Sequence, residues 1–422
     1  MTGLRQIGIA TTLFVTVIAG CATPIGQAGL APTISAMSQP IQRLSPDLAP
    51  PDGKRPVTMF SYIAMDDGLS SFAELYLNAL ESTANARVNT LAFADLQGGD
   101  SSFLFKIQPD RDGRKISSQR SFLSPTQKEV AANDPAVVAA TVNWAFSTYE
   151  SPFRAMTMFA HGGGYLGLGT DETQPGKKDP KQIMSVAEFG NALRTGLKGR
   201  KLHVMNMLSC LMGNVEYAYE LKDVSEVLIA SEDSIMATDD TTANFTAEFQ
   251  RQLGGTDLDA RAIGKRMAIY GNAKSDKSGY LTISAIDLTK MDEIRRTVNV
   301  LSNSLLRAMP TRKAEIVKAY DAVPKLQLDE MGQRDLWNFC NQVQSVSDPA
   351  VRNAGLDVKT SLRQVLLHTR DKEGAAANGL SICMPPRAAL AQLTKHPLYA
   401  ATLQSKFAKA TAWGDFIGAM AK

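Results

Sequence analysis

Two stretches decide how this sequence folds: Met156-Thr-Met-Phe-Ala-His-Gly-Gly-Gly164 and Val204-Met-Asn-Met-Leu-Ser-Cys-Leu-Met-Gly213. Each begins with an apolar run of the length of a buried strand and ends in residues that favour a turn. Open α/β sheets carry their chemistry at the ends of such strands. We therefore expect His161 and Cys210 to emerge at strand ends and to form a nucleophilic site.

Apolar periodicity around these stretches alternates between strand and helix. The pattern predicts strands at Val57–Ala64, Val88–Asp95, Phe103–Ile107, Ala155–Ala160, Leu202–Leu208, Val227–Ala230, Leu281–Asp287 and Leu380–Met384, and helices at Leu69–Thr83, Pro135–Tyr149, Val186–Leu197 and Met212–Leu221. Such alternation predicts the α/β class, with a mainly parallel central sheet that helices flank on both faces.

The C-terminal third of the chain shows a mainly helical pattern instead of this alternation. From residue 290 to about 367 the chain is rich in helix-forming residues, with Ile294, Val298 and Leu301 at helical spacing. We expect a core over residues 56–289 and a C-terminal helical subdomain over 290–422. A strand within Gly379–Pro385 is expected to return to the sheet, and Trp413–Phe416 to lie in or near a last helix.

The N-terminus reads as a processing signal. After Arg5, the apolar stretch Ile7–Ala19 is too short to span a bilayer comfortably, and small residues precede Cys21. This resembles a bacterial lipobox, which implies a signal peptide over 1–20, a lipidated Cys21 and a flexible tether up to residue 55. Because Ala22 follows the cysteine, the resemblance implies a cell-envelope protein at the outer membrane or facing the periplasm. An ordinary secretory signal is the alternative.

Composition and motifs exclude several function classes. A formal charge of +3 gives no reason to expect a nucleic-acid partner. No cluster has zinc-ligand spacing, and Asp66-Asp67-Gly68 is too short for a calcium loop, so no metal ligand is predicted. The glycine-rich stretch lacks the ending of a phosphate loop, and no serine-hydrolase elbow is present.

Cys210 is the reactive thiol candidate. Cys340 and Cys383 lie in apolar patterns typical of small core residues, whereas turn-forming residues flank Cys210. A predicted helix starting just after Cys210 would favour the thiolate. Among four histidines, His161 is the one placed to act as base. The glycines after it suit close backbone approach, so amides of Gly162 and Cys210 are expected to bind an oxyanion.

These motifs resemble those of clostripain-like cysteine peptidases, relatives of caspases, gingipains and legumains with a caspase-like fold. The resemblance covers nearly all of the chain beyond residue 56. It implies that Cys210 is the nucleophile, that His161 is general base and acid, and that no third catalytic residue is needed. No cofactor is expected, and calcium is implied by the resemblance alone. The matching segments are Met59–Leu69, His161–Gly164, Ser209–Leu221, Ala230–Asp233, Leu281–Asp287, Asp335–Phe339 and Gly379–Ile382.

One position departs from the family pattern. Members that cut after Arg or Lys usually carry Asp two residues before the catalytic cysteine, and here that residue is Leu208. A buried guanidinium without a carboxylate costs roughly several kcal/mol. The substrate-binding residues are expected to be Leu208 and Ser209, with the charge supplied from the following loop by Glu232, Asp233, Asp239 or Asp240. Otherwise the pocket accepts a less polar side chain.

A polar segment, Gln174–Lys181, lies between the two motifs and is predicted to be an exposed loop. The resemblance implies activation by self-cleavage there, at Lys177 or Lys178 if basic specificity is kept. An ordinary surface loop is the alternative.

The leading hypothesis is thus a lipid-anchored cell-envelope cysteine endopeptidase that acts on a peptide or protein substrate. One alternative is an inactive pseudo-peptidase that serves as a lipid-anchored binding or scaffold protein. Another is an acyl transferase with the same dyad.

Overall fold

The structure is a computed structural model that describes residues 44–171, 183–278, 282–326, 332–369, 376–393, 395 and 397–422. Two predicted features, the lipidated Cys21 and the nicked segment 174–181, lie outside the described residues. Within the described part, no helix is both long enough and apolar enough to cross a membrane.

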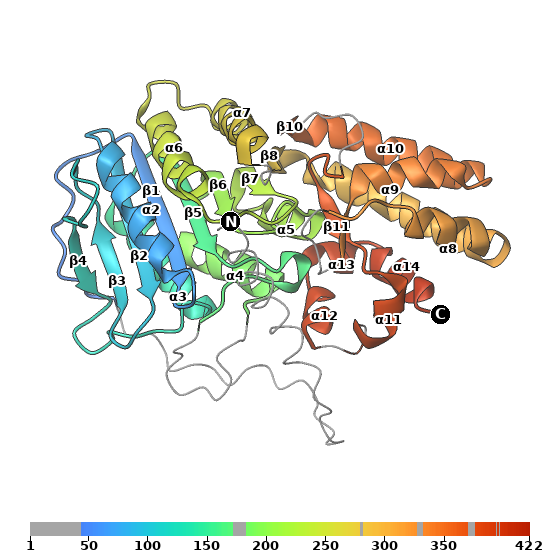
Figure 1. The fold of residues 1–422 in the computed structure, drawn as a ribbon, viewed down its shortest axis with the longest axis horizontal. Coiled ribbons are helices and arrows are strands. Elements are labelled where there is room, and N and C mark those ends of the chain that lie inside the picture. Colours follow the sequence, from blue (N-terminus) through green and yellow to red (C-terminus); the bar gives the residue numbers. More distant parts are fainter. Residues whose placement is uncertain are drawn as a thin grey trace, which may run out of the picture. The chain divides into compact units, whose positions relative to one another are not determined.

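The described residues form one large sheet and one small one. Nine strands make the large sheet, in the order β10-β8-β7-β6-β5-β1-β2-β3-β4, and β9 pairs with β11 (Figure 1). The strands β2, β1, β5, β6 and β7 run parallel, and the strands at both edges are antiparallel. The bounds are β1 (Val57–Met65), β2 (Val88–Leu96), β3 (Ser102–Lys106), β4 (Gln119–Phe122), β5 (Phe153–Ala160), β6 (Leu202–Leu208), β7 (Ser225–Ser231), β8 (Ile283–Asp287), β9 (Gln333–Asp335), β10 (Leu366–His368) and β11 (Ser381–Cys383).

Helices cover both faces of the large sheet (Figure 1). One face packs in a core with α2 (Ser70–Thr83), α6 (Phe245–Gly254) and α7 (Ala260–Ser278). The other packs with α3 (Pro135–Thr148), α4 (Val186–Leu197) and α5 (Val215–Leu221). Because both faces are covered, the central strand β1 is buried along its whole length, which is why its sequence reads as a nearly continuous apolar run. The predicted class, with a mainly parallel sheet flanked by helices, is confirmed.

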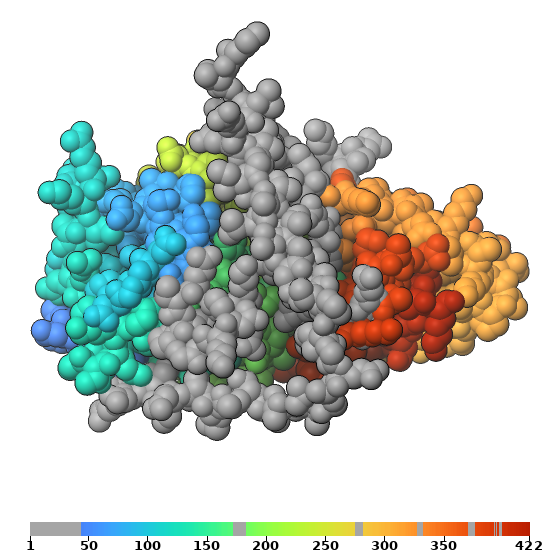
Figure 2. All heavy atoms as spheres, turned by 60° about the horizontal axis from the view of Figure 1, so that its bottom comes forward, coloured from blue at the N-terminus to red at the C-terminus, as the bar shows by residue number. Residues whose placement is uncertain are grey.

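The C-terminal region is helical, as predicted. Its elements are α8 (Met291–Asp321), α9 (Leu336–Gln342), α10 (Pro349–Val365), α11 (Arg387–Leu393), α12 (Pro397–Thr402), α13 (Lys406–Ala410) and α14 (Trp413–Met420). Pro310 lies inside α8, and non-helical backbone angles at Arg312 mark the kink that a proline causes. In Figure 2, the described residues up to about 122 and those of the C-terminal region lie at opposite ends of the face shown.

Two predictions about connections are corrected. The strand predicted within Gly379–Pro385 does not return to the large sheet: β11 pairs with β9, and the strand that joins the large sheet is β10, antiparallel to β8. The tether was also predicted too long. Residues from 44 onward are bound to the core, because Ser45 donates to the carbonyl of Leu123 and Tyr149 donates to that of Ala49.

A buried carboxyl group joins α5 to the C-terminal region. Glu216 is 2% exposed, and its Oε1 accepts a hydrogen bond from the amide of Cys383 in β11. Burial raises the pKa of Glu216 to about 7, although the hydrogen bond from Cys383 opposes the shift. The folded protein therefore holds a proton that the unfolded chain releases from about pH 4.3 upward.

We predict that Glu216→Gln stabilises the protein at alkaline pH. The contribution of the protonated carboxyl is fully present below the unfolded pKa and is lost as pH rises through about 7. Gln keeps the acceptor for Cys383 and stays neutral, so its gain should reach about 3 kcal/mol at pH 8 and vanish near pH 4. Urea unfolding of both proteins across this range gives the difference. A difference that does not vary with pH would contradict the prediction.

Candidate active site

The winding of the sheet brings three strand ends together. β1 pairs in parallel with β2 on one side and with β5 on the other, so the direction of winding reverses between β1 and β5. Ligand sites of open α/β sheets lie at the carboxyl ends of strands beside such a reversal. The pairing of Ala64 with Ala160, and of Phe159 with Leu208, aligns the ends of β1, β5 and β6. The residues that follow these three strands therefore share one edge.

The loop after β5 is a tight glycine-rich turn. Gly169 donates to the carbonyl of His161 and Gly163 donates to that of Gly167, both at 2.9 Å, which aligns Gly162 opposite Leu168. The amides of the neighbours are used within the turn, and the amide of Gly162 does not take part in it. The loop thus fixes His161 at the strand end and leaves its next amide pointing out of the turn.

Gly162 lies directly against the backbone of Cys210. A Cβ built on Gly162 would overlap the carbonyl oxygen of Cys210 and lie 2.9 Å from its nitrogen. Met212 Cε would be 2.8 Å away. The absence of a side chain at Gly162 therefore sets how closely the histidine loop and the cysteine turn approach each other.

The turn after β6 has an unusual backbone. Leu211 has a φ of +66°, a left-handed conformation that costs a non-glycine residue about 1–3 kcal/mol. Its amide donates to the carbonyl of Asp233 and its own carbonyl accepts from Asn214 and Gln333. The turn is therefore held by the loop after β7, by the N-cap of α5 and by β9 of the C-terminal region.

The helix after this turn begins later than predicted. α5 starts at Val215, with Asn214 as its N-cap, rather than at Met212. Cys210 is therefore not beside the positive end of the helix dipole. Its thiol is bonded to Ile235 instead: the Ile235 amide donates to Sγ at 3.3 Å, and Sγ is 3.5 Å from the Ile235 carbonyl oxygen. Burial raises the pKa of the Cys210 thiol, so it is protonated in this state.

Asp67 is a neighbour of His161 that the sequence did not identify. Its Oδ2 lies 3.4 Å from Nε2 of His161 and also accepts a hydrogen bond from Thr170. Its Oδ1 accepts from the amide of Leu69, so the carboxylate is fixed at the start of α2. Asp67 is 2% exposed at its side chain and His161 19%. This contact can orient the imidazole.

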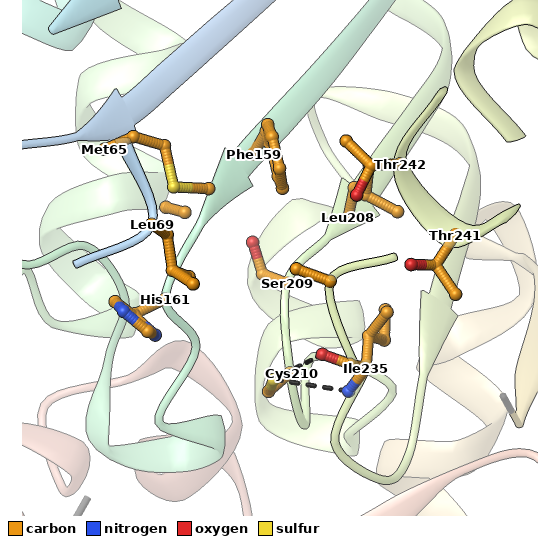
Figure 3. Close-up of a pocket in the computed structure, with 12 residues that line it drawn as sticks. Met65, Leu69, Phe159, His161, Leu208, Ser209, Cys210, Ile235, Thr241 and Thr242 are labelled. Atoms are coloured by element: carbon orange, nitrogen blue, oxygen red, sulfur yellow. Dashed lines mark hydrogen bonds between the residues drawn. The ribbon is translucent and has the colours of Figure 1, made fainter. Parts of the chain in front are cut away.

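His161 and Cys210 share the rim of one pocket (Figure 3). In that view the two side chains lie at the same end of the pocket, and Met65, Phe159 and Leu208 lie at the other. The empty space between its lining residues, open solvent included, is about 330 Å³. Its lining comes from the strand ends and from the loop after β7: Met65, Leu69, Phe159, Ala160, His161, Leu208, Ser209, Cys210, Ile235, Ala237, Thr241 and Thr242.

Comparison with known proteins agrees with this geometry. The model of the clostripain family, peptidase family C11, matches residues 61–419. The chain belongs to the clostripain family. It is therefore a cysteine peptidase, a hydrolase, as predicted. No curated protein sequence matches the chain.

Solved clostripain-family structures share the fold. A secreted C11 cysteine protease from Bacteroides thetaiotaomicron, in complex with an irreversible peptide inhibitor, is 16% identical with a TM-score of 0.60. An inactive zymogen C11 protease from Parabacteroides distasonis is 15% identical, also with a TM-score of 0.60. Each comparison covers 85% of this chain and 99% of the other.

The structure separates the predicted substrate-binding residues of this clostripain-family chain into two groups. Leu208 and Ser209 line the pocket. Glu232 does not: it is buried, accepts a hydrogen bond from the amide of Gly379, and shares a hydrogen bond with the carboxyl of Asp335. Burial and the nearby Asp335 raise the pKa of Glu232, and burial raises that of Asp335 to about 6, so the pair holds a proton.

The other predicted carboxylates also lie outside the pocket lining. Asp233 accepts a hydrogen bond from the amide of Ser234, and its own amide donates to Thr282. Asp240 accepts from the side chain of Asn244 and lies 3.9 Å from Lys274 Nζ. Asp239 belongs to the same π-helical turn, Asp239–Asn244.

One group of carboxylates has the geometry of a cation site. Oxygens of Asp66, Asp95 and Glu129 lie within 4.8 Å of one another, and oxygen ligands of this kind suit calcium. Burial raises the pKa of Asp95, and it raises that of neighbouring Asp171 to about 7. Protons can therefore relieve the repulsion, and the cluster alone does not indicate a metal.

We predict that Gly162→Ala abolishes most activity whereas Gly163→Ala does not. A methyl group at Gly162 must displace the Cys210 backbone, while one at Gly163 would lie 3.3 Å from Gly167 O, a contact that a small shift relieves. Alanine keeps the N–H of residue 162 but displaces it, and since loss of an oxyanion donor typically costs about 10²–10³ in kcat, we expect a loss of that order for Gly162→Ala and less than about tenfold for the control. Peptide hydrolysis by both folded variants is the measurement. Equal activities would show that the close approach is unimportant.

Proposed function

We propose that this clostripain-family peptidase cleaves peptide bonds with a catalytic dyad of Cys210 and His161. The observation that carries the proposal is that both side chains line one pocket while Gly162 lies against the Cys210 backbone. The arrangement joins a thiol, an imidazole and two backbone amides at aligned strand ends. These are the groups that acyl transfer to a thiol requires.

The proposed reaction begins when substrate enters the pocket and the thiol leaves Ile235. His161 takes the thiol proton, and the thiolate attacks the peptide carbonyl carbon. The amides of Gly162 and Cys210 bind the oxyanion. His161 then gives the proton to the departing amine, which leaves a thioester on Cys210. Water, deprotonated by His161, attacks the thioester and releases the acid and the thiol.

Asp67 is proposed as a positioning residue for His161. Its carboxylate lies beside Nε2 and is fixed by the amide of Leu69 and the hydroxyl of Thr170. A fixed acceptor at Nε2 holds the imidazole ring in one orientation during the proton transfers. Since the carboxylate contacts His161 and the Leu69 amide but not the thiol, its removal should weaken the reaction without abolishing it.

We predict graded losses for variants of these residues. Cys210→Ala should abolish cleavage of a peptide library. Asp67→Asn keeps the acceptor for Leu69, so it should fold, and we expect kcat to fall by roughly 10- to 100-fold with KM little changed, since misorientation acts on the reacting geometry.

Cys340→Ala is the matched control, because Cys340 is buried in the core away from the site and its variant should stay active. Cleavage by folded Cys210→Ala would disprove the dyad. Complete inactivity of the folded wild type would favour the pseudo-peptidase. Ligated products instead of hydrolysed ones would favour the acyl transferase.

We also propose a lipid anchor at Cys21 and a nick within residues 174–181. The lipobox-like sequence supports a lipid-anchored protein of the bacterial cell envelope, and one fold relative is itself a secreted protease.

The chain on either side of residues 174–181 is tied to the histidine loop, because Leu168 pairs with Met184, so a nick would loosen that loop. Self-cleavage at Lys177 or Lys178 requires a pocket that accepts a basic side chain; with an apolar pocket, a nick in this segment would have to be made by another peptidase. Mass spectrometry of the mature protein tests both proposals. An unlipidated Cys21 would refute the anchor, and a fully active intact chain would refute activation by the nick.

A further inference from the structure

We propose that the pocket beside Cys210 binds an apolar side chain such as Leu or Met, and not Lys or Arg, on the substrate residue whose carbonyl is attacked (P1). The inference rests on the proposed function, because it assigns the pocket to the substrate of the Cys210 dyad. It goes further by naming the class of bond that is cut.

The far end of the pocket is apolar. Met65, Phe159 and Leu208, at or near the ends of β1, β5 and β6, are at most 5% exposed and lie opposite the dyad (Figure 3). Leu69, Ile235 and Ala237 add apolar side walls. A side chain that fills this space exchanges water for carbon contacts, which favours aliphatic groups by about 0.8 kcal/mol for each buried CH₂.

The polar groups of the pocket carry no charge that could bind a cation. The Ser209 hydroxyl donates to the carbonyl of Met158 at 3.4 Å. The Thr241 hydroxyl donates to the carbonyl of Met236 at 2.5 Å and also contacts Thr238. The hydroxyl of Thr242 can offer one hydrogen bond but no formal charge. An ammonium or guanidinium group at the far end would therefore lack an ionic partner.

The nearby carboxylates are held elsewhere by contacts of their own. Glu232 faces Asp335 and Gly379, and Asp240 faces Asn244. Asp67 lies at His161 and is fixed by Leu69 and Thr170. Among the described residues that line the pocket there is no Asp or Glu. Burying an unpaired cation there costs far more than burying an aliphatic group gains.

The chain path assigns this pocket to P1. Leu208 and Ser209 directly precede Cys210, so the pocket opens on the side of the nucleophile. The P1 side chain is attached one carbon from the carbonyl that the Cys210 sulfur attacks. The other side of the bond must instead approach His161, which protonates the departing amine.

The test is a set of peptides that differ at one residue only, with Leu, Met, Arg, Lys or Asp on the amino side of the expected cut. We expect kcat/KM for Leu or Met to exceed that for Arg or Lys by about 100-fold or more. Mass spectrometry of the fragments identifies the residue on each side of the cut. Preference for Arg or Lys at P1, or an apolar preference on the far side of the bond only, would overturn the inference.

A pair of variants isolates the charge at the far end of the pocket. Leu208→Asp should raise kcat/KM for Arg and Lys peptides at least tenfold, and Leu208→Asn, which has the same shape without charge, should not. If Leu208→Asp does not fold, Leu208→Ala replaces it: an enlarged apolar pocket should shift preference toward Phe and gain nothing for Arg. Gain of basic cleavage by Leu208→Asn or Leu208→Ala would contradict the inference.

Two further outcomes separate this inference from the proposed function. Cleavage after Arg or Lys that disappears in Cys210→Ala would leave the dyad intact and refute only the apolar pocket, as would a Cys210-dependent nick after Lys177 or Lys178. No cleavage of any peptide by the folded wild type, together with no labelling of Cys210 by a thiol-reactive peptide, would refute both.

Discussion

The contact on which the site depends is the approach of the Gly162 backbone to that of Cys210. The parallel register of β5 and β6 brings the ends of the two strands level. Because Gly162 has no Cβ, its backbone can approach the Cys210 backbone more closely than any other residue would allow. Backbone geometry therefore places both amides, and the imidazole and thiol start from fixed backbone positions before Asp67 and Ile235 contact them.

The same edge of the sheet also uses acidic groups for structure. Glu232, at the end of β7, shares a hydrogen bond with Asp335 and thereby joins the core to the C-terminal region, while Glu216 reaches the amide of Cys383. The turn that carries Cys210 is also bonded to Gln333 of β9. The C-terminal region is thus part of the support of the site, although none of its described residues lines the pocket.

The sequence predicted what is encoded locally. Central strands such as β6 and helices such as α4 have their predicted bounds, because burial on both faces leaves continuous apolar runs and amphipathic helices leave a regular spacing. The short strands β4, β9 and β10 were missed, since three or four residues are too few to show a period. The sequence could place Glu232 near the site but could not give the direction of its side chain. Asp67 lies too far from His161 in the chain for their contact to be foreseen.

The bond between the Cys210 thiol and Ile235 has a consequence for the enzyme at rest. Oxidants and disulfides react with thiolates and hardly at all with thiols. Burial raises the pKa of the Cys210 thiol, although the Ile235 amide opposes the shift, and the thiol lies against the Ile235 carbonyl, so it stays in the less reactive protonated form until Ile235 is displaced. In an oxidising environment, such masking slows the oxidation of the Cys210 sulfur.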